Sequence, residues 1–150
     1  MNMKMKIMTV LLAWFLGAAP AWAVLGQPAS SVQSDQAYFH GMLAQAARQG
    51  YEVHEITAPE GTVVREYVSP QGTVFGVSWQ GPVMPNLSQL LGSYAADFQH
   101  ASQSPHPRRG PLVVRNDRVV IESGGHMRAF HGRAYLPSLL PNNLTQAVVQ

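Results

Sequence analysis

Apolar and polar residues alternate along residues 51–79, and two turn signals interrupt the pattern. The signals are Pro59-Glu60-Gly61 and Pro70-Gln71-Gly72. Proline presets φ for the first turn position, and glycine accepts the left-handed conformation that closes a tight hairpin. Because side chains of a strand alternate between the two faces of a sheet, the pattern predicts a three-stranded antiparallel meander over residues 51–79.

The two turns also predict which residues stand opposite one another. The first turn pairs Glu55 with Arg65, and the second pairs Arg65 with Val77. Alternation then predicts one core face and one more exposed face, with the core face carrying Tyr51, Val53, Val63, Tyr67, Phe75, Val77 and Trp79. Arg65 falls on that apolar face, where a charge needs a partner, so Glu55 and Arg65 form a candidate structural ion pair.

Two segments have the apolar spacing of helices that pack on a sheet. The first covers about residues 35–49, with Ser34 or Asp35 as its N-cap and Gly50 as its end. The second covers about residues 87–98 and is capped by Asn86. We expect Trp79 to be buried against this second helix.

Further hairpins are predicted over residues 112–136, with turns at Asn116-Asp117 and Gly124-Gly125. The predicted fold class is therefore α+β, an antiparallel β-sheet made of the meander and these hairpins and packed against the two helices. Residues 99–111 are rich in serine, proline and arginine and predict a mobile loop. Residues 137–150 predict an extended tail.

Residues 1–23 have the features of a secretory signal peptide. Lys4 and Lys6 precede an apolar run over residues 7–19, and Ala21-Trp22-Ala23 has the small-x-small form of a cleavage site. The run is shorter than the roughly 20 residues that a spanning helix needs. We expect cleavage after Ala23, no membrane anchor afterwards, a periplasmic or extracellular location, and a single domain over residues 24–150.

Charge and cysteine content narrow the classes of partner and chemistry. The chain carries a formal net charge of +2, but its two lysines lie in the predicted signal peptide, which leaves eight arginines against eight acidic residues. This balance gives no indication of nucleic-acid binding. The absence of cysteine excludes disulfides, thiol catalysis and zinc–thiolate sites.

No catalytic or cofactor-binding motif is present, so we assign no catalytic, cofactor or metal residue. His126 and His131 are an odd number of residues apart and would fall on opposite faces of one regular strand, which is unfavourable for a shared metal ion. Arg108, Arg109, Arg128 and Arg133 are a candidate surface for anionic groups or a partner. The alternative for these arginines is a solvated surface with no ligand.

Several ordered blocks of the sequence resemble one protein family. The blocks are Leu25-Gly26, Val64-Arg65-Glu66-Tyr67, Phe75-Gly76-Val77-Ser78-Trp79-Gln80-Gly81-Pro82, Leu90-Leu91-Gly92 and Met127-Arg128-Ala129-Phe130-His131-Gly132-Arg133-Ala134-Tyr135-Leu136-Pro137. They are similar to a small exported bacterial family catalogued as domain of unknown function 2844. The resemblance implies an exported protein of one domain, and it brings no activity, cofactor or catalytic residue.

The sequence favours a non-catalytic exported protein that binds an envelope protein or polymer. The reasons are the small α+β domain, the absence of a catalytic motif and the polar loop. The alternative is a small exported hydrolase that uses histidine and carboxylate groups such as His54 and Glu66. An open groove with a strongly perturbed histidine would favour the enzyme, whereas a sheet face with an exposed apolar patch would favour binding.

Overall fold

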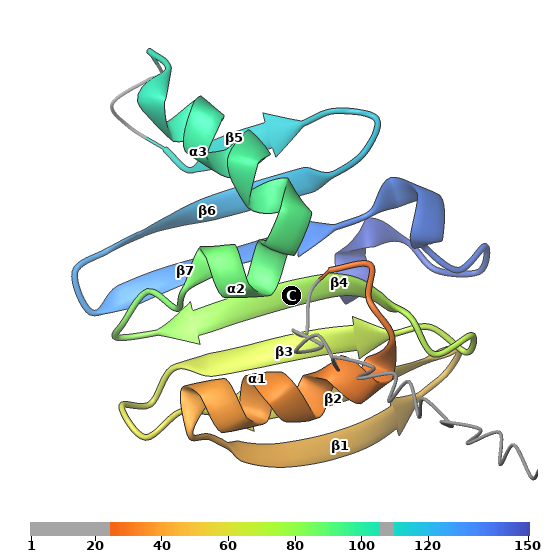
Figure 1. Cartoon of the computed structure of the whole chain (residues 1–150). Coiled ribbons are helices and arrows are strands. Elements are labelled where there is room, and N and C mark those ends of the chain that lie inside the picture. Colours follow the sequence, from red (N-terminus) through yellow and green to blue (C-terminus); the bar gives the residue numbers. More distant parts are fainter. Residues whose placement is uncertain (1–24, 106–109) are drawn as a thin grey trace, which may run out of the picture.

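The computed structural model describes residues 25–105 and 110–150, and Figure 1 shows a single antiparallel sheet with helices in front of it. The sheet has seven strands in the order β1-β2-β3-β4-β7-β6-β5. The strands are Met42–Arg48 (β1), Tyr51–Thr57 (β2), Val63–Val68 (β3), Val74–Gly81 (β4), Leu112–Arg115 (β5), Val120–His126 (β6) and Ala129–Tyr135 (β7). The predicted α+β class with an antiparallel sheet is confirmed.

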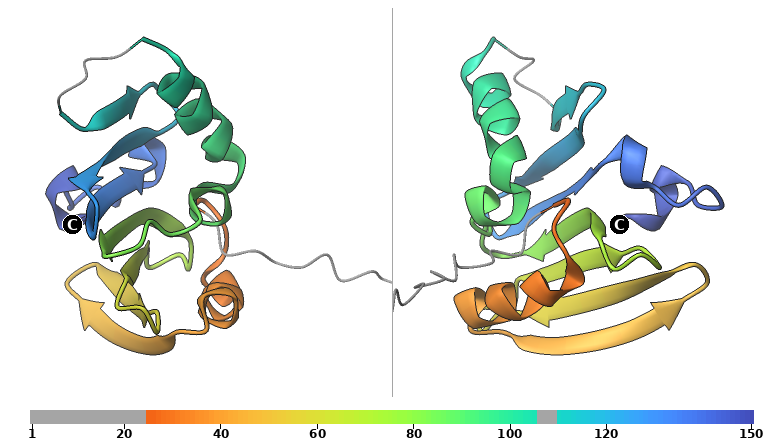
Figure 2. Two further views of the ribbon diagram at one scale, coloured as in Figure 1. Left: turned by 90° about the vertical axis from the view of Figure 1, so that its left-hand side faces the viewer. Right: turned by 45° about the vertical axis from the view of Figure 1, so that its right-hand side comes forward.

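Helices and the C-terminal tail cover opposite faces of this sheet, as Figure 2 shows from the side. The face under the helices, here called the helix face, is covered by α1 (Val32–Phe39), α2 (Leu87–Leu91) and α3 (Ala95–Gln103). The opposite tail face is covered by residues 136–150, which include the 3₁₀ turns Pro137–Leu139 (η3) and Gln146–Val148 (η4). None of the described helices is long and apolar enough to cross a membrane.

The predicted helix over residues 35–49 is wrong in its second half. Helix α1 ends at Phe39, His40 takes a left-handed φ of 50°, and residues 42–48 form the edge strand β1. Strand β1 pairs with β2 in unbroken register, from Met42 opposite Thr57 to Arg48 opposite Tyr51. The small and apolar residues of β1 satisfy helical spacing, but pairing with β2 gives the backbone a full ladder of hydrogen bonds, and this tertiary contact decides the conformation.

The second predicted helix is present but divided. Asn86 caps α2 as expected, because its side-chain oxygen accepts from the backbone N–H groups of Ser88 and Gln89 at 3.0 and 3.3 Å. Gly92 (φ 52°) then separates α2 from α3 through the 3₁₀ turn Gly92–Tyr94 (η2). Helix α3 continues to Gln103 and so takes the start of the segment predicted as a mobile loop. Residues 106–109 of that segment lie outside the described residues.

The first meander turn has the predicted register and the second does not. Glu55 stands opposite Arg65, but a β-bulge shifts the β3–β4 pairing so that Tyr67 stands opposite Gly76 and Val68 opposite Val74. Phe75 is the extra residue of the bulge, and residues after it change face relative to the prediction. Arg65 therefore stands opposite Ser78 rather than Val77.

Both faces of the sheet are consequently buried, so the expected division into one core face and one exposed face is wrong. Val64, Val77 and Trp79 pack under the helices with Leu90 and Leu91, which confirms the expected burial of Trp79 beside this helical segment. On the tail face, the buried residues are Tyr67, Phe75, Val120, Tyr135 and Val149. Strand β4 at the centre of the sheet is buried on both sides from Val74 to Trp79.

The C-terminal half also departs from the prediction in its turn and its tail. Strand β6 continues through Gly124 and Gly125, and the hairpin turns instead at Met127-Arg128, where Arg128 has φ 67°. The tail folds back over the sheet, and Val149 is fully buried there. Gly76 permits this approach, since a Cβ at that position would lie 2.7 Å from Cγ2 of Val149.

Candidate ligand-binding groove on the tail face

One row of polar side chains crosses five strands on the tail face. The pairing places Glu55 of β2 opposite Arg65 of β3, and Arg65 opposite Ser78 of β4. Ser78 in turn stands opposite Arg133 of β7, and Arg133 opposite Glu122 of β6. The row therefore reads Glu–Arg–Ser–Arg–Glu from one side of the sheet to the other, with Ser78 at its centre, and we call it the polar row.

Each arginine of the polar row is anchored by its outer glutamate in the same way. Arg65 Nε donates to Glu55 Oε2 at 2.8 Å, and Arg133 Nε donates to Glu122 Oε2 at 2.8 Å. The side chains of Arg65 and Glu55 are 31% and 39% exposed, and those of Arg133 and Glu122 are 28% and 26% exposed. The predicted ion pair Glu55–Arg65 is thus present, and a second pair accompanies it.

The C-terminal residues are held on the polar row through their main chain. Arg133 Nη1 donates to the carbonyl oxygens of Gln146 and Val149, at 3.4 and 3.2 Å. Ser78 Oγ and the Tyr67 hydroxyl both donate to the main-chain oxygen of Gln150, at 3.0 and 2.5 Å. The Gln150 N–H donates back to the Tyr67 hydroxyl at 3.1 Å. These contacts involve backbone groups of the tail, so the row recognises polypeptide without reading its side chains.

Two grooves open on the tail face and meet at this segment. The larger groove, about 610 Å³, runs over β1–β3 and is lined by Arg48, Tyr51, Val53, Glu55, Arg65 and Tyr67, among others. The smaller groove, about 320 Å³, lies over β4, β7 and β6, with Ser78, Glu122, His131 and Arg133 in its lining. Arg65, Gln80 and Gln150 line both grooves. Arg65 is therefore the charged side chain that the two grooves share.

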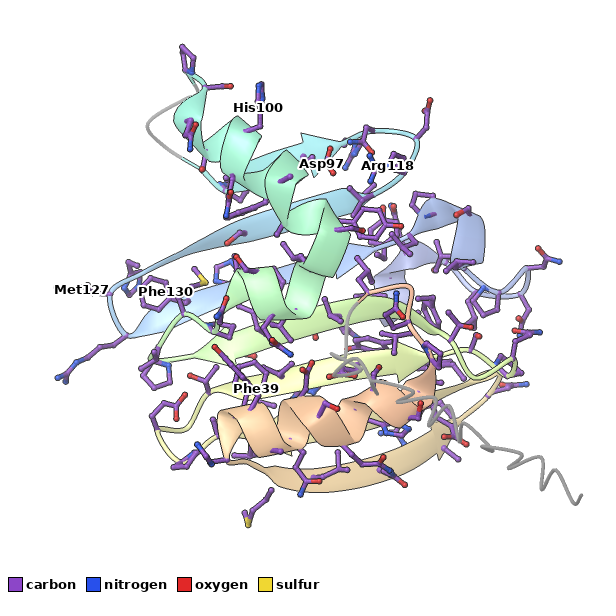
Figure 3. All side chains as sticks on the ribbon, viewed as in Figure 1. Phe39, Asp97, His100, Arg118, Met127 and Phe130 are labelled. Atoms are coloured by element: carbon purple, nitrogen blue, oxygen red, sulfur yellow. The ribbon has the colours of Figure 1, made fainter. Side chains whose placement is uncertain are left out.

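The two described arginines of the predicted anion-binding surface, Arg128 and Arg133, do not line the same groove. Arg133 belongs to the polar row, whereas Arg128 lies in the β6–β7 turn and lines a different hollow with Pro82 and Phe130. Met127 and Phe130, labelled in Figure 3, mark this end of the sheet. Arg108 and Arg109 lie outside the described residues. Among the residues that the structure describes, no group of three or more histidine or acidic side chains is placed to hold a metal ion.

The residues of the alternative hydrolase hypothesis lie on the helix face. His54 is 6% exposed, and its ring contacts the side chains of Gln45 (3.4 Å) and Glu52 (3.3 Å). Glu66 is 1% exposed beneath the helices. Neither residue lines the larger or the smaller groove. This arrangement gives His54 and Glu66 no shared opening to a substrate.

Glu66 belongs instead to a buried carboxyl pair that the sequence did not reveal. Asp35, expected only as a possible helix cap, lies inside α1 and is 1% exposed. Gln89 of α2 donates to Asp35 Oδ1 at 2.6 Å, which joins the two helices. Asp35 Oδ2 and both oxygens of Glu66 have no hydrogen-bond donor in the described residues as long as both carboxyls are ionised.

A proton shared between Asp35 and Glu66 supplies the hydrogen bond that two ionised carboxyls would lack. Burial raises the pKa of Asp35 to about 6, against the opposing effects of its hydrogen bonds with Gln89 and Glu66. Burial raises the pKa of Glu66 well above its usual range, and the negative charge of Asp35 and a hydrogen bond with it raise it further. Glu66 is therefore the protonated member and donates to the Asp35 carboxylate.

We expect the free energy of unfolding to fall as pH rises from about 4 to 6, where Asp35 titrates, and to continue falling above pH 6 because the pKa of Glu66 is raised further. Both carboxyl pKa values are higher in the folded protein than in the unfolded chain, so the folded state binds more protons and is favoured at low pH. A shift of the size given for Asp35 corresponds to roughly 3 kcal/mol. Glu66→Gln keeps a neutral donor beside Asp35 and should flatten this slope in urea unfolding curves measured from pH 4 to 8. Glu60→Gln, at an exposed turn, is the control, and equal slopes in all three proteins would contradict the shared proton.

The Glu55–Arg65 pair should contribute modestly to stability. About a third of each side chain remains exposed, so the pair belongs near the range of surface ion pairs, about 0–1 kcal/mol, and below the ~3–5 kcal/mol lost when a fully buried pair is broken. A double-mutant cycle with Glu55→Gln and Arg65→Met, followed by chemical denaturation, measures the coupling energy. A coupling of several kcal/mol would show that the pair is more desolvated than its exposure indicates. Strictly additive effects would show that the pair contributes nothing.

Comparison with known proteins places the chain in a family without assigning it an activity. No curated protein and no solved structure matches it. One family model matches residues 21–149, which includes every strand and helix described above. The chain therefore belongs to the family described as "Protein of unknown function (DUF2844)".

Proposed function

We propose that the protein is exported and acts in the cell envelope as a non-catalytic binding protein, with the larger groove as its ligand site. The observation that carries the proposal is the position of Arg65. Glu55 holds its Nε at 2.8 Å, and the guanidinium lies at the border of a groove of about 610 Å³. An oriented guanidinium beside the aromatic rings of Tyr51 and Tyr67 is a combination that suits ligand recognition.

The chemistry of the groove residues supports binding rather than catalysis. No serine or tyrosine hydroxyl lining the two grooves is hydrogen-bonded to a histidine or to an acidic side chain within the described part of the chain. An activated nucleophile requires such a base within hydrogen-bond reach. His54 and Glu66, on which the alternative hydrolase would depend, lie on the other face of the sheet.

Export is supported by the N-terminal pattern, and the contacts of Leu25 are compatible with the predicted cleavage position. Leu25, the second residue after the predicted cleavage position, is only 3% exposed and donates its N–H to the Leu90 carbonyl at 3.2 Å. Cleavage after Ala23 would leave this contact intact. Cleavage several residues later would remove Leu25 from the core.

We expect the protein expressed in a Gram-negative host to be recovered from the periplasm or medium with Val24 as its first residue. Intact mass and N-terminal sequencing measure this directly. Replacing the small residue before the cleavage site, as in Ala23→Arg, should leave residues 1–23 attached. A full-length wild-type chain found only in the cytoplasm would overturn the proposal of export.

Binding through the larger groove is tested by capture from an envelope extract. Wild-type protein, Arg65→Met and Arg118→Met are immobilised and exposed to the same extract, and the retained components are identified by mass spectrometry and by sugar analysis. Arg118 is exposed near β5, where it stacks over the ring of Tyr94 at 5.3 Å and lines neither groove; Figure 3 labels it.

The expected result is a component retained by the wild type and by Arg118→Met but lost from Arg65→Met. Thermal unfolding of all three proteins verifies that the variants are folded. Retention of the same components by all three proteins would rule out the larger groove as the ligand site.

A further inference from the structure

The two halves of the polar row are built alike but have different neighbours. Arg65 and Arg133 stand on either side of Ser78, and each is fixed by a 2.8 Å hydrogen bond from Nε to the outer glutamate. A guanidinium fixed through Nε presents its Nη atoms as a rigid pair of donors. The two arginines therefore offer the same kind of binding group to whatever lies over them.

The Arg133 half shows which ligand this group accepts. Arg133 Nη1 donates to the carbonyl oxygens of Gln146 and Val149, and the side chain of Val149 is fully buried beside Gly76. The ligand here is a polypeptide segment of the chain itself, held by main-chain carbonyls and one aliphatic side chain. No charged group of the tail takes part in these hydrogen bonds.

The Arg65 half has the same donors and an adjoining apolar surface. The Nη atoms of Arg65 have no hydrogen-bond partner in the part of the chain that the structure describes. Beside Arg65, the larger groove contains Tyr51 and Val53, which are both half-buried and pack with the tail-face core. At Arg133 the tail supplies a carbonyl acceptor and an aliphatic side chain. The Arg65 half offers the matching groups of the protein, which are free donors and an apolar surface.

Charge distinguishes between classes of ligand. Glu55 balances Arg65 and Glu122 balances Arg133. Arg115 also contacts Glu122 at 3.4 Å and Arg48 lines the larger groove, so the charges are close to balanced with a small excess of arginine. A polyanion such as a phosphorylated or uronate polymer would lie against the two glutamates as well as the two arginines. Neutral carbonyl oxygens avoid that repulsion.

We propose that the larger groove binds an extended polypeptide segment of another protein, with main-chain carbonyls accepting from Arg65 and an aliphatic side chain resting on Tyr51 and Val53. This inference rests on the proposed function and specifies its ligand. Recognition through the backbone allows segments of varied sequence to bind as long as one aliphatic residue is correctly placed.

The test uses an array of random decapeptides with amidated C termini and no Asp or Glu, so that Arg65 can find only carbonyl acceptors. Binding of wild type, Arg65→Met, Arg65→Lys and Arg118→Met is measured by fluorescence anisotropy on the best peptides. We expect affinity about tenfold or more lower for Arg65→Met, an intermediate loss for Arg65→Lys, which lacks the planar fork, and no change for Arg118→Met.

A parallel arm with alginate, a soluble polyuronate, separates this inference from the proposed function. Absence of any Arg65-dependent peptide binding overturns the inference, because a folded groove with this recognition mode must select peptides from such an array. If alginate then shows Arg65-dependent binding, the proposed binding function stands and its ligand is a polyanion. If the binding of neither peptides nor alginate depends on Arg65, and capture from the envelope extract does not depend on it either, both proposals are wrong.

Discussion

The β-bulge between β3 and β4 is the constraint on which the rest of the structure depends. Phe75 is the inserted residue, so Phe75 and Gly76 both lie toward the tail face, while Val77 and Trp79 lie toward the helices. Without the bulge, Val77 would stand beside Arg65 and Trp79 would face the tail. The insertion of one residue thus places the large ring of Trp79 under the helices and a serine at the centre of the polar row.

Once both faces of a sheet are buried, each polar side chain within it needs a partner. The two faces meet this requirement differently. On the helix face, Asp35 and Glu66 are paired by a shared proton, with Gln89 as an additional donor. On the tail face, the charges of the polar row are balanced by neighbours on adjacent strands, and the tail supplies carbonyl acceptors. Among the described residues of the helix face, Trp79 Nε1 and Gln89 Oε1 stay buried without a partner, whereas on the tail face Arg65 lines the open grooves.

How far the sequence predicts this arrangement depends on how local each determinant is. The Pro59–Gly61 turn is local, so the Glu55–Arg65 pair could be predicted from residues within one hairpin. The bulge has no sequence signature of its own beyond Gly76, so its position could be found only from the tertiary structure. Residues 42–48 satisfy helical spacing as well as strand pairing, so the strand β1 also could be assigned only from its pairing with β2. The Arg133–Glu122 pair also lies within one hairpin, but it was missed because the β6–β7 turn was predicted at Gly124-Gly125 instead of Met127-Arg128. The position of Ser78 beside this pair needed the tertiary structure, because β4 and β7 are joined only across a long intervening segment. The packing of residues 137–150 on the sheet could not be predicted either, because their few apolar residues show neither the strand nor the helix period.

The position of the tail has a consequence for how a ligand could act on this fold. Gln150 lines both grooves, and its main-chain oxygen is held by Ser78 and Tyr67 at the point where the grooves meet. A segment bound along Arg65 would therefore lie directly beside residues 146–150 and share Tyr67 with them. Contacts between the two segments would add to binding, whereas a ligand extending across Ser78 would have to displace the tail and expose Val149. Exposing the fully buried Val149 alone would cost about 1.5–3 kcal/mol, and the hydrogen bonds from Ser78, Tyr67 and Arg133 to the tail would be lost as well. The tail is thus anchored by a buried side chain and by several hydrogen bonds, which favours a ligand that binds beside it over one that displaces it.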